Sequence, residues 1–352
     1  MKRYNISITI LYCVIYKMEQ DKYRKVVREQ NIKDILTTWR APRDLFGPLS
    51  KFVRSNVNDL QILLELLPDK PWNASSLSNN PNTTWEIVQG NPQIKWNWSA
   101  LSNNPNITWD IIQRNPGRSW NWNGISRNPN ITWDIVHSNP YKPWNWNGIS
   151  RNPNITRDIV QSNPDKPWDW WALSQNPNIT WEVVQNNLDK RWHWETLSRH
   201  PNITWEIVRT NQGLPWHWGG LSENPNITWE IIQNNLDKRW DWWGLSSNPN
   251  ITWDIIKNNP NKPWYWDGIS LNPNITWQNV RSNLDKKWNW EALSRHPNIT
   301  WDIIKDNPDI PWDWTYLSLN PNITWEIVYD NQDKPWSWNY LSGNLFQLGL
   351  PN

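Results

Sequence analysis

The segment NPNITWDIIQRNPGRSWNWNGISR, residues 104–127, decides the fold, because residues 128–151 repeat it as NPNITWDIVHSNPYKPWNWNGISR. The same pattern returns without insertion or deletion from about residue 69 to residue 343, at the constant period of twenty-four positions that separates Thr108 from Thr132. Its Thr-Trp pair supplies a clear marker, since the Thr occurs eleven times between Thr84 and Thr324. A fixed period that covers most of a chain predicts a solenoid of stacked repeats.

Tryptophan belongs to this repeat. The 352-residue chain contains 36 Trp, and all but Trp39, Trp171 and Trp243 fall into three columns, with Arg157 the one break in the third column. Examples are Trp96, Trp120 and Trp144 in the first column, Trp98, Trp122 and Trp146 in the second, and Trp109, Trp133 and Trp181 in the third. Large aromatic side chains supply much buried area to short helices, so we expect at least two columns to form the core.

Each repeat contains two similar halves, which begin at Thr108 and at Asn121 in the segment quoted above. Thr and Asn are favourable N-cap residues, and the acid that follows the Thr-Trp pair suits the positive end of a helix. The Asn-Pro pairs that close each half stop a helix after about two turns. The expected fold class is therefore all-α, a superhelical α-solenoid without a sheet. Each of its eleven to twelve repeats holds two short helices, of which one is either α-helical or 3₁₀.

The junction Asn152-Pro153-Asn154-Ile155-Thr156 resembles that of the leucine-rich repeat variant, a right-handed solenoid in which an α-helix alternates with a 3₁₀ helix. This chain departs from that family by placing Trp where the family uses aliphatic residues. The unit that begins NPNITWDIV at Asn128 is also similar to Trp-rich tandem repeats of uncharacterised proteins in large double-stranded DNA viruses. That resemblance implies a viral source and no particular activity.

The chain ends differ from the repeats. We expect the solenoid to occupy residues 57–344, beginning with a degenerate capping repeat at 57–68, and a short tail to occupy 345–352. Helices spaced about 8–10 Å apart give a curved rod on the order of 100 Å long. The last repeat lacks its Pro and is followed by an apolar tail, so the C-terminal end is predicted to be poorly capped and open to association.

Residues 1–56 form a basic segment with 12 Lys and Arg against 5 Asp and Glu, whereas residues 57–352 carry 23 against 28. An apolar run from Ile6 to Tyr16 has the length of a signal-peptide core but no small-residue cleavage site follows it. Translation from either Met1 or Met18 fits the sequence, and with Met18 residues 1–17 are not part of the working protein. We favour an intracellular location, in the host cytoplasm or the virion if the source is viral, and expect no membrane span.

The repeats show no pattern typical of an enzyme, a cofactor site or a metal site. The five His do not have ligand spacing, although His193 and His217 share a column, and the acid in each repeat suits helix capping better than catalysis. Asn-Ile-Thr triplets such as Asn106-Ile107-Thr108 match glycosylation sequons, but we interpret them as turn and cap residues. Because the repeats carry net negative charge, we do not expect them to bind nucleic acid through their backbone phosphates.

Positions that vary among the copies are free of the packing pattern and are expected to be exposed. One such position holds Trp171 and Trp243, and a turn position holds Arg191, Arg239 and Lys287, each two repeats after the last. Duplication of repeat pairs explains this spacing without function, and Trp with cations is also typical of interface hot spots. We therefore expect a non-catalytic scaffold that binds a protein partner. The alternative is a rod that binds glycans or single-stranded nucleic acid through an exposed Trp column.

Overall fold

The computed structural model describes residues 59–346, apart from a few side chains of its first helix, and divides the chain into two compact units at residues 1–68 and 69–352. In the first unit the described element is α5 (Asp59–Leu66), which covers the expected capping segment and buries Leu64. The expectations for residues 1–56, including the choice between Met1 and Met18, and for the last six residues lie outside the described residues.

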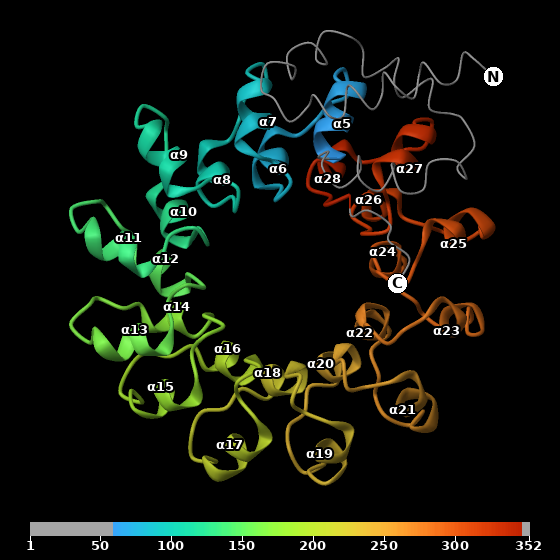
Figure 1. Ribbon diagram of the computed structural model, residues 1–352. Coiled ribbons are helices and arrows are strands. Elements are labelled where there is room, and N and C mark those ends of the chain that lie inside the picture. Colours follow the sequence, from blue (N-terminus) through green and yellow to red (C-terminus); the bar gives the residue numbers. More distant parts are fainter. Residues whose placement is uncertain (1–58, 347–352) are drawn as a thin grey trace, which may run out of the picture. The chain divides into compact units, whose positions relative to one another are not determined.

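The second unit consists of short α-helices that form two concentric series (Figure 1). Between residues 59 and 346 the structure has no strand, and no 3₁₀ helix separates the α-helices, so the all-α repeat solenoid is confirmed with both helices of each repeat α-helical. The inner helices are α6 (Ala74–Asn79), α8 (Trp98–Ser102), α10 (Trp122–Arg127), α12 (Trp146–Arg151), α14 (Trp170–Leu173), α16 (Trp194–Arg199), α18 (Trp218–Glu223), α20 (Trp242–Ser247), α22 (Trp266–Leu271), α24 (Trp290–Ser294), α26 (Trp314–Leu317) and α28 (Trp338–Leu341). The outer helices are α7 (Trp85–Gly90), α9 (Trp109–Arg114), α11 (Trp133–Ser138), α13 (Arg157–Ser162), α15 (Trp181–Gln185), α17 (Trp205–Thr210), α19 (Trp229–Gln233), α21 (Trp253–Asn258), α23 (Trp277–Arg281), α25 (Trp301–Asp306) and α27 (Trp325–Asp330).

Local sequence fixes where these helices begin and end. In every outer helix except α15, the preceding Thr accepts a hydrogen bond from the third residue of the helix, as Thr108 does from the Ile111 amide. Asn121 caps the inner helix α10 in the same way. The Asn that follows an outer helix donates from its side chain to the carbonyl four residues earlier, as Asn115 does to Ile111 at 2.8 Å. Asn211 makes the same bond although Gln212, and not Pro, follows it. The Asn side chain therefore helps to end these helices, and it does so even where no Pro follows.

A ladder of buried polar residues joins each repeat to the next. The Oγ of Ser102 accepts a hydrogen bond from the backbone amide of Asn121 at 2.8 Å, and the Nδ2 of Asn128 donates to the carbonyls of Ser102, Asn104 and Ile107. These groups are almost fully buried, so each donor must find an acceptor inside the protein. The repeated Ser and Asn thus satisfy the backbone of turns that no sheet or long helix supports.

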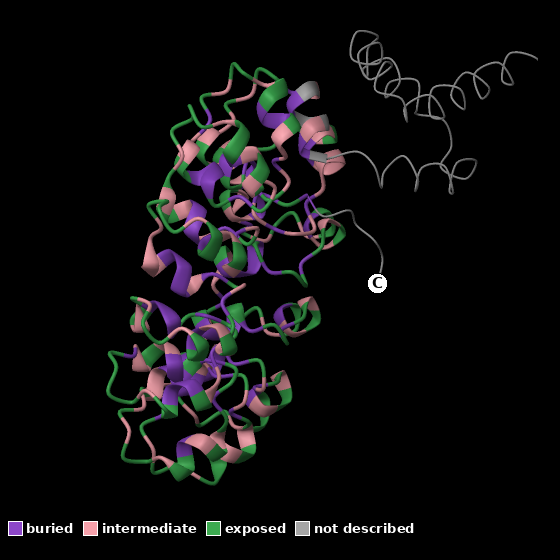
Figure 2. Ribbon diagram, turned by 60° about the vertical axis from the view of Figure 1, so that its left-hand side comes forward, coloured by how far each residue is buried: buried purple, intermediate pink, exposed green. Residues whose placement is uncertain are grey.

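Tryptophan fills the space between repeats. Trp120 lies edge-on to Trp98 of the preceding repeat, with ring centroids 5.1 Å apart, and tilted against Trp85 at 6.4 Å, while its Nε1 donates to the Asn115 carbonyl. Members of the first column are buried or half-buried, and the other two columns are half-buried. None of the column Trp is among the exposed large hydrophobic residues. Only the first column therefore contributes buried Trp to the core, and the other two columns pack against it half-buried, so the expected two core columns are found in part. Buried residues follow the helices along the whole series (Figure 2).

The repeat is wedge-shaped, which bends the solenoid. The helix pairs in closest contact are all successive inner helices, such as α10 with α12 and α16 with α18. A Cβ added to Gly220 would lie 2.5 Å from the backbone oxygen of Glu195 in the preceding inner helix, so the chain approaches closely there. The outer helices are not among these closest pairs, and their Trp rings reach the next repeat instead, as Trp85 of α7 does at 6.4 Å from Trp120. Close packing on one side and wide packing on the other produce curvature.

This curvature brings the two ends of the solenoid together, which corrects the expected open rod. The Asn73 amide donates to the Ser342 Oγ at 2.9 Å, and the Asn80 Nδ2 donates to the carbonyls of Ser342 and Asn344. The Trp72 and Trp338 rings meet edge-on at 5.0 Å. Inside the ring the same amide-to-Ser bond joins each repeat to the one before it, and Asn73 takes the place of the next repeat after Ser342. The second unit is therefore a closed ring of twelve inner helices, and α28 packs on α6 as one repeat packs on the next.

Closure also removes the physical basis for the poorly capped C-terminal end. Phe346 is 1% exposed, and the Leu345 carbonyl accepts a hydrogen bond from the Asn82 Nδ2 of the first repeat. The apolar residues expected to remain open for end-to-end association are thus partly used by the ring itself.

Candidate functional site

The inner helices have two positions that stay at least partly exposed in every copy, although several of these side chains also reach the neighbouring repeat. They are the second residue of each inner helix and the residue four places later, which lie on one helix face because four residues make about one turn. We call this set the inner band. It comprises Ser75, Asn79, Ser99, Asn103, Asn123, Arg127, Asn147, Arg151, Trp171, Gln175, Glu195, Arg199, Gly219, Glu223, Trp243, Ser247, Asp267, Leu271, Glu291, Arg295, Thr315, Leu319, Asn339 and Gly343. Its members are exposed or half-buried in every copy.

Trp171 and Trp243 both belong to the inner band, as their variation among the copies predicted. They occupy the same position on α14 and α20, with 42% and 41% of their surfaces exposed. The Arg151 guanidinium lies over the Trp171 ring at 5.0 Å, and the His193 ring lies 5.0 Å from it on the other repeat. Tyr265 and Leu271, which are also exposed, follow Trp243 in the next repeat. The two Trp are the largest apolar side chains of the band.

Arg191, Arg239 and Lys287 lie elsewhere, in the turns that lead from an outer helix to the next inner helix. All three are exposed, and exposed Leu188, Leu236 and Leu284 precede them in the same turns. No ion pair or cation–π contact joins the three cations to other described residues. In particular, Arg151 lies over the Trp171 ring and Arg191 does not. The structure thus exposes both sets of residues but does not bring them into contact.

The structural Trp columns and the Asn-Ile-Thr triplets serve the fold. The Nδ2 of Asn130, the sequon Asn of one copy, donates to the carbonyls of Pro105 and Ile107 in the preceding repeat. A glycan on this nitrogen would replace hydrogens that the repeat interface uses. The interpretation of these triplets as turn and cap residues therefore has a direct structural cause.

Histidine side chains are likewise committed to local structure. His193 and His217 are the N-caps of α16 and α18, and the His217 Nδ1 accepts a hydrogen bond from the Gly220 amide. His200 and His296 replace the ladder Asn in two repeats, where burial lowers the pKa of each imidazole. Across residues 59–346, no three His, Cys, Asp or Glu side chains gather in a way that could hold a metal ion.

Sequence reasoning missed one pair of residues in the inner band. Arg127 and Arg151 end two successive inner helices and stand in the same position of their repeats. The signal was present in the sequence, because the residue four places before each Arg is Asn and not an acid. Only the repeat geometry shows that these two positions face each other across an interface.

The part of the chain that the structure describes contains no helix with the length and apolar character needed to cross a membrane. Comparison with known proteins adds no function, since no family model, curated protein or solved structure matches the chain.

Proposed function

We propose that the repeat ring is a non-catalytic scaffold that binds another protein through its inner band, with Trp171 and Trp243 as the main contacts. The observation that carries this proposal is the exposure of two Trp side chains at a position where the other repeats have no aromatic residue. Trp is among the residue types that most often dominate the energy of protein interfaces.

Comparison among the twelve inner helices supports the proposal. At the position of Trp171 and Trp243 the other ten helices carry small or polar residues, namely Ser75, Ser99, Asn123, Asn147, Glu195, Gly219, Asp267, Glu291, Thr315 and Asn339. The repeat therefore packs equally well without an aromatic side chain there. A Trp that the fold does not need, and that water contacts, is better explained by an external partner than by stability.

The absence of catalysis is part of the same proposal, and local chemistry supports it. The buried His200 uses both ring nitrogens, since Nε2 donates to the Asn176 carbonyl and Nδ1 accepts from the Asn202 amide. His296 has the same two partners in its repeat. A general acid or base needs a nitrogen that can reach a substrate, and these imidazoles have none to offer.

The test is a quantitative capture experiment with the full chain and with the double variant Trp171→Asn/Trp243→Asn, which carries the Asn found at this position in α10 and α12. The matched control is Thr315→Asn, which changes the same position in α26. We expect the double variant to lose proteins that the wild type and the control retain at equal bait concentration. Equal capture by all three forms would overturn the proposal.

A second arm addresses the glycan and single-strand alternative. A glycan array and single-stranded oligonucleotides are offered to the same three forms. Binding by the wild type that disappears in the double variant would assign the exposed Trp to those ligands and would also overturn the proposal of a protein partner. We expect no such binding, because the column Trp that would form a continuous platform pack against one another.

A further inference from the structure

Arg127 and Arg151 form a positively charged pair within the inner band. The Arg127 side chain crosses the interface onto α12, where its Cγ lies 3.4 Å from a Cβ placed on Gly148 and its terminal nitrogen donates to the Asn147 Oδ1 at 3.2 Å. Arg151 lies over the exposed Trp171 ring. Partial burial, together with repulsion from the Arg127 guanidinium, lowers the pKa of Arg151. Both Nε atoms are buried and have no hydrogen-bond partner in the protein.

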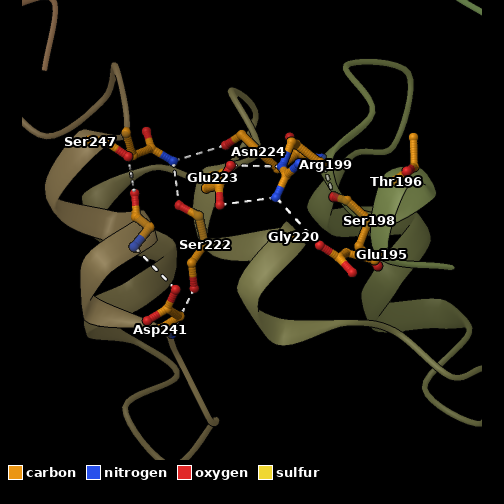
Figure 3. Close-up of polar contacts among 12 residues, drawn as sticks. Glu195, Thr196, Ser198, Arg199, Gly220, Ser222, Glu223, Asn224, Asp241 and Ser247 are labelled. Atoms are coloured by element: carbon orange, nitrogen blue, oxygen red, sulfur yellow. Dashed lines mark hydrogen bonds and ion pairs between the residues drawn. The ribbon is translucent and has the colours of Figure 1, made fainter. Parts of the chain in front are cut away.

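The same two positions in α16 and α18 show how the ring neutralises an arginine at this interface. Arg199 replaces Arg127, and Glu223 replaces Arg151 (Figure 3). The Arg199 Nε and Nη2 atoms lie 2.7 Å and 3.0 Å from the two Glu223 carboxylate oxygens, and Glu195 lies 3.8 Å from the same guanidinium. The geometry of the repeat therefore brings these two side chains within bonding distance of each other. In α10 and α12 the Glu is replaced by a second Arg, and the partner four residues earlier is Asn.

The helix dipole accounts for one part of this arrangement only. A cation at the last position of a helix is favourable, which explains each Arg singly. It does not explain two adjacent guanidinium groups without a direct carboxylate partner. Asp169 acts on Arg151 through space, but its oxygens accept from the Ala172 amide and the Asn147 Nδ2. The acid that attracts Arg151 is therefore already bonded to other donors.

We propose that Arg127 and Arg151 together bind a phosphate group, with Trp171 beside it. A phosphate offers several oxygens to two planar guanidinium groups and supplies the negative charge that Glu223 supplies at the α16–α18 interface. Partial burial of the pair strengthens such charge-assisted hydrogen bonds relative to those of fully exposed cations. This site shares Trp171 with the proposed protein-binding surface, but its test follows phosphate at the two arginines and does not depend on whether a protein is captured.

The experiment follows the arginine side-chain Nε–H signals of the isotope-labelled full chain by NMR during titration with inorganic phosphate. Phenyl phosphate in a second titration distinguishes free phosphate from a phosphate ester whose ring contacts Trp171. We expect the Arg127 and Arg151 signals to shift with saturation, while the Arg199 signal stays unchanged because Glu223 occupies its partner position. Shifts that are equal for all arginines, or none at Arg127 and Arg151, would overturn the proposal.

Two variants separate the site from general effects on the ring. Arg151→Glu recreates the Arg199–Glu223 pair at this interface, and it should weaken phosphate binding roughly tenfold or more while leaving the ring folded. Conversely, Glu195→Asn/Glu223→Arg transplants the paired arginines to α16 and α18 and should create a second set of saturable shifts at Arg199. Unchanged affinity in Arg151→Glu would refute the assignment, and thermal unfolding of each variant shows whether the ring is intact.

Discussion

The junction that closes the ring and the junctions inside it share one geometry but differ in how they are held. At closure the distance from the Asn73 amide to the Ser342 Oγ is 2.9 Å, and the same bond at the α6–α8 junction is also 2.9 Å long. The edge-on Trp rings are 5.0 Å apart at closure and 5.1 Å apart at the α8–α10 junction. Interior junctions have the peptide chain as an additional link, whereas closure depends on side-chain and backbone contacts alone. The comparison teaches that the interface itself sets the angle between repeats.

The closing junction is also the less regular of the two. Asn80 donates to the Ser342 and Asn344 carbonyls across it, as Asn104 does to the Ser78 and Asn80 carbonyls at an interior junction, so this part of the ladder is shared. Phe346 stands where interior repeats have an Asn such as Asn130, and its backbone adopts φ of 42°, a region that large side chains rarely adopt.

Removing a ladder Asn should have the largest effect. Asn128→Ala leaves the buried Ser102 carbonyl without a donor, removes one of two donors from the Asn104 and Ile107 carbonyls, and takes away the acceptor of the Asn130 amide. It should lower the free energy of unfolding by about 2 to 4 kcal/mol. Asn80→Ala removes the corresponding bonds at closure, where no covalent link holds the ends, so it should open the ring and leave the interior repeats folded. Circular dichroism during urea unfolding measures the first effect, and small-angle X-ray scattering measures the second as an increase in radius of gyration.

Comparison of these two variants can also contradict the distinction between closure and interior junctions. If Asn80→Ala reduced stability as much as Asn128→Ala without any expansion, closure would be as strongly held as an interior junction. The difference drawn between the two kinds of junction would then be wrong.

Gly220→Ala should destabilise one interior junction by about 1 to 3 kcal/mol, because the added methyl group meets the Glu195 backbone oxygen at 2.5 Å and the Ser198 Cβ at 3.0 Å. Gly213→Ala is the matched control, since no atom lies within 4 Å of its Cβ position. Thermal unfolding should give a lower midpoint for Gly220→Ala alone. Equal unfolding midpoints would mean that the added methyl group does not disturb the packing of α16 on α18, and that the wedge shape of the repeat does not depend on this close approach.

Acid should weaken two interior junctions and spare closure. Burial holds the pKa of His200 and His296 below the ordinary value of 6.5, so the unfolded chain binds protons more readily than the folded one. Protonation would also place a hydrogen on the Nδ1 atom that accepts from the Asn202 amide. Stability should therefore fall as the pH drops below about 6.5 and continue to fall until the lower folded-state pKa is reached. Unfolding in urea at a series of pH values measures this slope.

The double variant His200→Asn/His296→Asn restores the ladder residue of the other repeats and isolates the cause of that slope. It should lose the part of the slope that begins near pH 6.5, while the carboxylates continue to titrate at lower pH. A slope that is unchanged in this variant would show that the two imidazoles are not responsible.

Arg157→Trp should give the smallest effect and strengthen an interior junction. Arg157 interrupts the third Trp column and pairs with Glu182 in an exposed ion pair, which contributes little to stability. A Trp there would restore the tilted contact that Trp133 makes with Trp168 at 5.6 Å, and should add about 0.5 to 1.5 kcal/mol. The thermal midpoint checks this, and a decrease would indicate that the ion pair matters more than the aromatic contact.

Local patterns in the sequence were enough to predict the repeat and its helices. The start of each helix was predictable from cap residues such as Thr108 and Asn121, and its end from the Asn-Pro pairs. Capping and the restriction of φ by Pro both act over a few residues. The aromatic core was predictable because a column that returns once in every repeat must face the same neighbour each time. The exposure of Trp171 and Trp243 followed from their variation among otherwise similar copies.

Closure into a ring depends on how the repeats pack in three dimensions. The period of the sequence is the same whether the stack is straight, superhelical or closed, since closure depends on a small rotation accumulated over twelve interfaces. That rotation comes from the distance of closest approach at positions such as Gly220 and from the bulk of Trp on the opposite side, which are properties of packed side chains. The same packing places Arg127 opposite Arg151, although the two residues are one repeat apart in the sequence. It also shows that neither guanidinium has a direct carboxylate partner and that both Nε atoms are unpaired.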